Sequence, residues 1–143
     1  MLDTRIFPPD YRGPYPHMFP LDIAVWERFL DKFGALYEGF QYDVMCGGDY
    51  KQFPRWEPEY QKDASVLSKL RIDVIGYQTE QLHLIEVKPR LNPAAIGQVL
   101  TYREHFIADY KPELPVRSVI VAGEGDQNVE KVAEANGIIF IQV

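Results

Sequence analysis

The sequence predicts an α/β fold, with a mixed central sheet flanked by helices. Residues 72–88 consist of two apolar, β-branched arms around a turn, a pattern typical of a β-hairpin. Residues 118–122 and 138–141 are unbroken apolar runs, as expected of strands covered on both faces. Segments with helical periodicity alternate with these strands. Strands covered on both sides belong to α/β architectures, so we expect this class of fold.

Length and composition indicate one globular domain. The chain has 143 residues, of which 46% are apolar and 25% charged, and this is enough to bury one core. We expect an N-terminal arm over residues 1–20 and a single domain over residues 21–143. One cysteine, Cys46, excludes a disulfide framework within the chain and a site that needs several of its thiolates. The start has no apolar signal core and no later stretch approaches a membrane span, so we expect a cytoplasmic protein.

The net charge of −6 argues against a protein that coats nucleic acid through bulk electrostatics. The charge is unevenly distributed, however. Residues 51–103 carry eight Lys or Arg against six acids, whereas the segments on either side are each acidic. The cations therefore gather in the segment that contains the hairpin, although a solvated face gives the same pattern.

The first half of the chain predicts an arm, a helix and a strand. Residues 1–20 hold five prolines among aromatic side chains, too many prolines for a helix and too many aromatics for a free tail, so the arm packs on its own body or on a partner. Residues 21–33 have helical periodicity and residues 35–44 alternate as a strand. Residues 49–66 interleave aromatic and cationic side chains, which either bind nucleic acid or fold over the core. We favour the second interpretation.

The hairpin brings two acids together. If residues 79–80 form its loop, counting back along each arm sets Asp73 opposite Glu86, and Lys88 projects from the same face. Side chains directly opposed across antiparallel strands lie roughly 5 Å apart, where two like charges repel by about 3 kcal/mol at an effective dielectric near 20. A divalent cation reverses that repulsion, and Mg²⁺ commonly binds through one or two carboxylates and several waters. The pattern therefore predicts a metal site.

An ordinary surface hairpin, with its charges facing water, is the alternative. Against it, both faces of the hairpin are otherwise apolar, with Ile75, Tyr77, Leu82 and Leu84 on one face and Ile72, Val74, Ile85 and Val87 on the other. Charges inside such a run need a reason.

The second half predicts a helix that begins at Asn92 and Pro93, then a strand over residues 116–122, a helix over 127–135 and a strand over 138–143. The first of these helices carries a stripe that we expect to be buried, formed by Ile96, Val99, Leu100, Arg103, Ile107 and Tyr110. Gln98 and Tyr102 are neighbours four residues apart that lie off this stripe, so burial does not explain them as a pair. Isolated polar positions on a helix are usually solvated.

The chain has, in order, Asp73, the motif Glu86-Val87-Lys88, and Gln98 and Tyr102 on the next helix. This order resembles the PD-(D/E)XK nuclease superfamily, in particular its RecB-type and λ-exonuclease-type members with a Gln-x-x-x-Tyr motif. The resemblance spans residues 21–122 but depends on about seven positions. It implies a restriction-endonuclease-like αβββαβ core. Ile72 stands where the family name has proline, and a single cysteine rules out the iron–sulfur cluster of some RecB-type nucleases.

The resemblance also implies roles for individual residues. Asp73, Glu86 and the Val87 carbonyl would bind Mg²⁺ or Mn²⁺, and Lys88 would orient the attacking water and stabilise the developing charge. Gln98 and Tyr102 would border the site and position the nucleic acid.

Three further positions are expected near this site. Glu27 on the first helix takes the place of the family's additional acid, although a surface glutamate fits the sequence equally well. Arg71 and Arg90, which flank the hairpin strands, are expected to contact nucleic acid.

The sequence thus predicts a metal-dependent deoxyribonuclease, bacterial or phage-encoded, in the cytoplasm or associated with a virion. A second hypothesis keeps the nuclease fold without catalysis, as an interaction or assembly protein that uses the N-terminal arm to bind a protein partner. A third is a dimeric junction-resolving or restriction-type endonuclease. The sequence leaves open the oligomeric state, the choice between DNA and RNA, and endonuclease against exonuclease action.

Overall fold

The computed structural model describes residues 5–48 and 69–143. In chain order the elements are helix α1 (Pro20–Phe33), the short 3-10 helix η1 (Gly34–Leu36), strands β1 (Gly39–Cys46), β2 (Leu70–Tyr77) and β3 (Leu82–Arg90), helix α3 (Pro93–Tyr110), strand β4 (Val116–Glu124), helix α4 (Gln127–Ala135) and strand β5 (Ile139–Gln142). The predicted order of elements is confirmed. The aromatic and cationic segment 49–66 lies outside the described residues.

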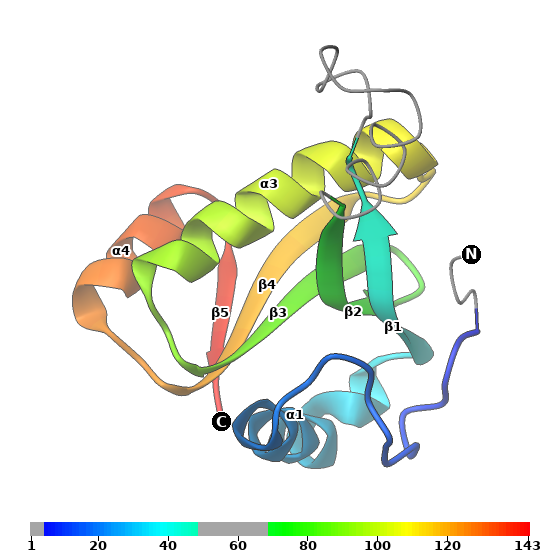
Figure 1. The fold of residues 1–143 in the computed structure, drawn as a ribbon, viewed down its shortest axis with the longest axis horizontal. Helices are drawn as coiled ribbons and strands as arrows, with labels where there is room; N and C mark the ends of the chain where they lie inside the picture. The colour runs from blue at the N-terminus through cyan, green and yellow to red at the C-terminus, as the bar shows by residue number, and fades with distance from the viewer. Residues whose placement is uncertain (1–4, 49–68) are drawn as a thin grey trace, which may run out of the picture.

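The five strands form one mixed sheet in the order β1-β2-β3-β4-β5. The pairs β1–β2 and β2–β3 are antiparallel, whereas β3–β4 and β4–β5 are parallel and are connected by α3 and α4. Figure 1 shows α1 on one side of the sheet and α3 and α4 on the other. The predicted α/β class with a mixed sheet flanked by helices is thus confirmed.

Each face of the sheet has its own apolar core. On the α1 face, Trp26 and Phe29 pack with Val74, Ile85 and Val119. On the other face, Tyr102 and Phe106 of α3 pack on strands β1 to β4. A third apolar cluster is formed by α4, the first turns of α3 and the carboxyl half of β4. Because both faces of the sheet are covered, the central strands carry apolar residues at adjacent positions as well as at alternate ones.

Two predicted details were wrong. Residues 34–36 form a 3-10 turn and β1 begins at Gly39, because the backbone must turn from α1 into the sheet before it can extend. On α3, Tyr102 is buried, while Arg103 is half-buried and Tyr110 is exposed. The buried stripe is therefore rotated toward Tyr102 and Phe106, whose rings pack against β1, β2 and β3.

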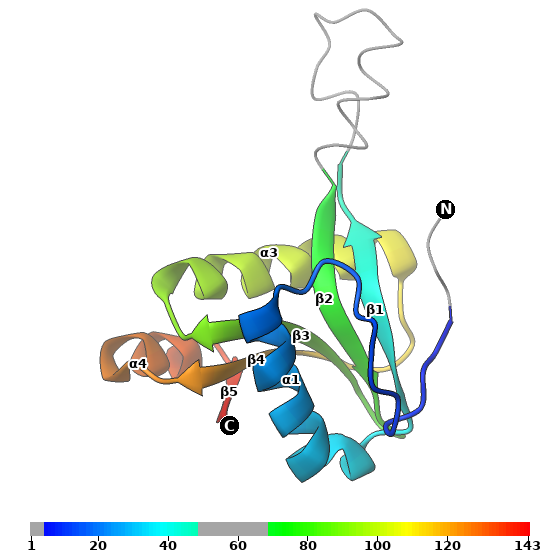
Figure 2. The ribbon, with the colours of Figure 1, turned by 60° about the horizontal axis from the view of Figure 1, so that its bottom comes forward.

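The N-terminal arm packs on the protein's own body over residues 5–19. Phe7 and Phe40 exchange two backbone hydrogen bonds of 2.7 and 2.9 Å, which adds a single bridge to the edge of β1. Tyr15 is buried in the α1-face core, and its ring lies 5.3 Å from that of Tyr42. In Figure 2 the arm crosses β1 and β2 before it enters α1. None of the helices in the described ranges is both long and apolar enough to cross a membrane.

Candidate functional site

The hairpin has the register that the sequence predicts, up to the acids. Tyr77 pairs with Leu82 and Val74 pairs with Ile85, which continues toward Asp73 opposite Glu86. The ladder ends at Val74 and Ile85, so the two acids are not joined by strand hydrogen bonds. Their side chains, rather than the backbone, determine how the strands meet at this level.

Asp73 takes the place of the missing ladder contact. Its Oδ2 accepts a hydrogen bond of 2.9 Å from the backbone N–H of Val87. A carboxylate that accepts from the backbone of the neighbouring strand holds the two strands at a fixed separation. Asp73 is therefore positioned by β3, next to the peptide between Glu86 and Val87.

Glu86 is buried in the middle of β3, and its side chain retains only 5% exposure. Its Oε1 lies 3.3 Å from the Nζ of Lys88, whose side chain is 24% exposed. Its Oε2 is buried and has no hydrogen-bond partner. One oxygen of a deeply buried carboxylate is therefore left unsatisfied, which is unusual in a native core.

The two carboxylates strongly affect each other's ionisation. Burial, and then the nearby charge of Asp73, raise the pKa of Glu86 to about 8, while Lys88 and the Tyr102 hydroxyl act in the opposite direction. Burial likewise raises the pKa of Asp73 to about 6, against the hydrogen bond from Val87 and the charge of Lys88. Without a cation, both carboxyl groups are therefore protonated more readily than exposed ones, and burial has the larger effect on Glu86.

Tyr102 of α3 lies near this pair, and Gln98 lies one turn before it on the same helix. Tyr102 lies close enough to Glu86 for each to affect the other's pKa, and burial raises the pKa of the phenol well above its ordinary value. The Oε1 of Gln98 is buried without a hydrogen-bond partner. Among the described residues, three buried side-chain polar atoms lack partners, and two of them belong to Glu86 and Gln98.

The described residues contain no group of three or more His, Cys, Asp or Glu side chains in metal-binding reach. Asp73 and Glu86 supply two carboxylates that a metal could share. Such a set matches the ligand number that Mg²⁺ takes from proteins when waters complete its shell.

Glu27 does not belong to this set. Its Oε2 accepts a hydrogen bond of 3.3 Å from the hydroxyl of Tyr15 and lies 3.9 Å from Arg12 Nε, so it ties α1 to the N-terminal arm. The acid of α1 that influences Asp73 is Asp22, whose charge raises the pKa of Asp73. From the sequence, only Glu27 of this helix is expected near the site; the signal that could have indicated Asp22 is that it is an acid in the first helical turn.

The two expected DNA-contacting arginines are differently placed. Arg71 makes two hydrogen bonds to the carboxylate of Asp43, at 2.9 and 2.6 Å, on the strand beside Asp73. Arg90 lies at the end of β3, exposed, and is 3.9 Å from Glu124 and 4.0 Å from Asp126. Arg71 is therefore the more firmly held of the two.

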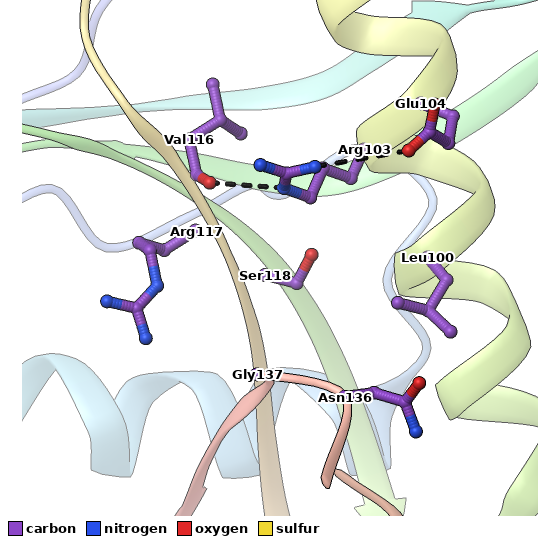
Figure 3. Close-up of a pocket in the computed structure, with 8 residues that line it drawn as sticks. All are labelled: Leu100, Arg103, Glu104, Val116, Arg117, Ser118, Asn136 and Gly137. Carbon is purple, nitrogen blue, oxygen red and sulfur yellow. Dashed lines mark hydrogen bonds and ion pairs between the residues drawn. The ribbon is translucent and has the colours of Figure 1, made fainter. Parts of the chain in front are cut away.

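A separate pocket of about 460 Å³ lies between the middle of α3, the start of β4 and the turn after α4 (Figure 3). Arg103 lines it with its Nε bonded to the Val116 carbonyl at 3.2 Å and its Nη1 4.0 Å from Glu104. Figure 3 shows Arg117 on the opposite side of the strand from Arg103, so the two guanidinium groups do not converge on one ligand. None of the residues that line this pocket belongs to the acidic pair.

Comparison with known proteins assigns no family to the chain. No family model matches it and no curated protein matches it. The crystal structure of AF1548, a protein of unknown function, is similar with a TM-score of 0.46 and 16% sequence identity. That similarity covers 84% of this chain, which spans 56% of the length of AF1548.

Proposed function

We propose that the protein is a metal-dependent nuclease that hydrolyses phosphodiester bonds of DNA, with Asp73, Glu86 and Lys88 as its catalytic set. The observation that carries this proposal is the buried Glu86 beside Asp73, with one oxygen near Lys88 and the other without a partner. A pure scaffold has no need of a buried Glu86 next to a half-buried Asp73, since burial and the charge of Asp73 both oppose the ionisation of Glu86.

The acids fit a hard divalent cation. Asp73 and Glu86 supply carboxylate oxygens, and the unpartnered Oε2 of Glu86 is an acceptor for which no donor is present. The Val87 carbonyl is proposed as a further ligand, because its peptide adjoins the N–H that holds Asp73. When bound, Mg²⁺ or Mn²⁺ would lower the pKa of a water and neutralise charge on the phosphate.

The remaining groups act on the nucleic acid. Lys88 supplies an ammonium group at the edge of the site, where it can donate to the attacking water or to a phosphate oxygen. Gln98 Oε1 is a buried acceptor that can orient a water or a sugar hydroxyl, and Tyr102 fixes the position of Glu86. Arg71 and Arg90 are proposed to contact backbone phosphates.

The element order α1-β1-β2-β3-α3-β4 supports a restriction-endonuclease-like core within the observed α/β fold. In that proposal Asp73 lies on the second strand, the Glu86-Val87-Lys88 motif on the third, and Gln98 and Tyr102 on the helix that follows. This is the arrangement that the resemblance to RecB-type nucleases implies.

The test is cleavage of labelled linear, nicked, branched and single-stranded DNA, and of RNA, in Mn²⁺, Mg²⁺ or EDTA. We expect cleavage in the presence of the metals alone, and a loss of at least 10²-fold in Glu86→Gln and Lys88→Met. Glu134→Gln, on the exposed side of α4, is the matched control and should retain full activity. Thermal melting of each variant shows whether it is folded.

The rival interpretation is a nuclease-fold interaction or assembly protein without catalysis. It predicts that Mn²⁺ leaves the melting temperature unchanged and that no substrate is cut by the folded wild-type protein. In our proposal, millimolar Mn²⁺ raises the melting temperature of the wild type and not that of Asp73→Asn, since a ligand that binds only the native state stabilises it.

A further inference from the structure

Phe19 and Leu21 are the two most exposed large apolar side chains among the described residues, at 75% and 69%. They flank Pro20, at the point where the N-terminal arm enters α1. Exposed apolar residues scattered singly need no explanation, so the position of this pair decides whether it matters.

Helix capping does not explain Phe19. It occupies the N-cap of α1, where Ser, Thr, Asp or Asn are preferred because their side chains accept a hydrogen bond from the first turn. A phenyl ring offers no such acceptor. Phe19 therefore contributes neither a side-chain cap nor a buried ring to stability, and its identity points to a role outside the fold.

The arm is fixed at the level of Asp73 just before Phe19. The Nε2 of His17 lies 3.5 Å from Asp43 Oδ2. Asp43 sits between the pairs Tyr42–Val74 and Val44–Ile72, so it lies beside Asp73 on the neighbouring strand. The same Asp43 holds Arg71, which leaves a cationic group next to this segment.

The segment is fixed at the same site just after Phe19. The backbone N–H of Phe19 donates to Asp22 Oδ2 at 3.2 Å, and the charge of Asp22 reaches Asp73. One turn later, a Cβ built on Gly123 of β4 would lie 3.4 Å from Val25 of α1 and 3.0 Å from the carbonyl of Pro89, directly after Lys88, so α1 lies close to the ends of both strands. In Figure 2 the first turn of α1 lies beside the carboxyl ends of β3 and β4.

These contacts hold an exposed aromatic ring, with a leucine beside it, at the margin of the acidic pair. The backbone around Phe19 is already ordered by its bonds to Asp22 and Ile23, so little ordering remains when a ligand binds. Aromatic side chains next to phosphate-binding cations are suited to stack nucleobases. Within a duplex both faces of a base are covered by its neighbours, so an unpaired base is the one that presents a face to such a ring.

We propose that Phe19 and Leu21 form a platform that stacks an unpaired nucleobase beside the scissile phosphate, so that the preferred substrate is single-stranded DNA or a frayed or flapped end. This rests on the proposed nuclease function and specifies its substrate class. In this proposal the backbone of that strand would pass by Arg71 and His17, which both contact Asp43.

The test measures binding of a fluorescein-labelled single strand and of a blunt duplex of the same sequence, by anisotropy in Ca²⁺, to wild type, Phe19→Ala, Phe19→Trp and Leu36→Ala. Stacking of one base is worth about tenfold in affinity or more. We expect Phe19→Ala to lose about tenfold for the single strand with no change for the duplex, and Phe19→Trp to retain binding. Leu36 is equally exposed, at 67%, beside the hairpin turn, so Leu36→Ala should be unchanged.

A 2-aminopurine placed near the end of the strand should lose fluorescence on binding to wild type and not to Phe19→Ala, because stacking quenches it. Equal loss for both DNAs, or no loss, overturns the platform. Failure of the nuclease function is distinguished by wild-type protein that neither cleaves DNA in Mn²⁺ nor melts at a higher temperature in it. If the wild type cleaves DNA in Mn²⁺ but does not prefer unpaired ends over duplex, the platform proposal is wrong and the nuclease proposal is retained.

Discussion

Glu86 is a carboxyl group that the fold makes difficult to ionise. Strand β3 carries it into the interior, Asp73 stands beside it, and Lys88 compensates through one oxygen only. Desolvation outweighs this single ion pair, as the raised pKa of Glu86 indicates. A cation bound to both carboxylates would reverse the balance, which links metal affinity to the proton that Glu86 holds.

Removal of the ionisable group at Glu86 should change how stability depends on pH. The pKa of Glu86 is raised from 4.5 to about 8 in the folded protein, so the native state binds this proton more tightly than the unfolded chain does. The stabilisation that protonated Glu86 gives to the folded protein is fully present below about pH 4.5 and is lost as the pH rises through 8. Between pH 5 and pH 9, the free energy of unfolding of the wild type should therefore fall by about 2–4 kcal/mol more than that of Glu86→Gln.

Urea unfolding in EDTA at pH 5, 7 and 9 measures this difference. Glu134→Gln, exposed on α4, serves as the control and should follow the wild-type curve. Parallel curves for wild type and Glu86→Gln would show that Glu86 ionises in the native state as freely as in water, which contradicts a raised pKa of Glu86.

At the scale of single residues, alternation along the strands was enough to find the acids. The register of the hairpin follows from its short turn, and Asp73, Glu86 and Lys88 follow from the register. Whether Glu27 belongs to the site could not be decided this way. It depends on how α1 lies across the sheet, and α1 turns Glu27 toward Tyr15 and Arg12 of the arm.

Among the elements, the hairpin is the one in which the faces predicted from the alternation of the sequence differ from the faces observed in the structure. The sequence predicted Ile72 and Val74 on one face, yet Ile72 packs on the α3 side and Val74 on the α1 side. The change occurs at Asp73, opposite Asp43, whose φ of 56° lies in the left-handed region. Asp43 also forms the ion pair with Arg71 at this point, and neither feature is visible in the periodicity of the sequence.

Gly76 and Gly97 should respond oppositely to alanine. A Cβ on Gly76 of β2 would lie 2.6 Å from the ring of Tyr37, whereas one on Gly97 of α3 would meet nothing within 4 Å. Gly76→Ala should lower the free energy of unfolding by about 2 kcal/mol, since the buried ring must move. Gly97→Ala should raise it by about 0.5–1 kcal/mol, because alanine loses less backbone entropy in a helix.

Chemical denaturation of the two variants and of the wild type provides the comparison. The pair controls for the chemical change itself, because both substitutions add one methyl group. If Gly76→Ala were as stable as wild type, Tyr37 would not be held against β2 by its hydrogen bond to His83.

At the scale of the whole molecule, the alternation of helices and strands predicted the layers, whereas the path of the arm could not be predicted. Proline and aromatic content indicated that residues 1–20 pack on something, without indicating what. The bridge of Phe7 to Phe40 and the rings of Tyr11, Tyr15 and Tyr42 show that residues 5–19 complete the α1-face core. Binding of a protein partner by the arm stays a prediction.

The arm should therefore contribute to stability in the protein alone. Phe7 is half-buried, pairs with Phe40 and touches Tyr11 and Tyr42, so Phe7→Ala should lower the free energy of unfolding by about 1–3 kcal/mol. Its neighbour Ile6 is exposed, and Ile6→Ala should change stability by less than about 0.5 kcal/mol. Thermal melting of the two variants tests whether the arm stabilises its own domain. If the arm served only to bind a partner, both variants would be as stable as wild type.

The same loss should reach the candidate site, because the arm carries His17 to Asp43 and sets the start of α1, where the charge of Asp22 raises the pKa of Asp73. We expect Phe7→Ala at a temperature where it is fully folded to bind Mn²⁺ as wild type does, because its ligands lie on β2 and β3. Its affinity for single-stranded DNA should fall by about threefold to tenfold, as the segment around Phe19 loses its anchor. Calorimetric Mn²⁺ titration and strand anisotropy measure the two quantities separately, and an equal decline in both would place the arm's influence on the acids themselves.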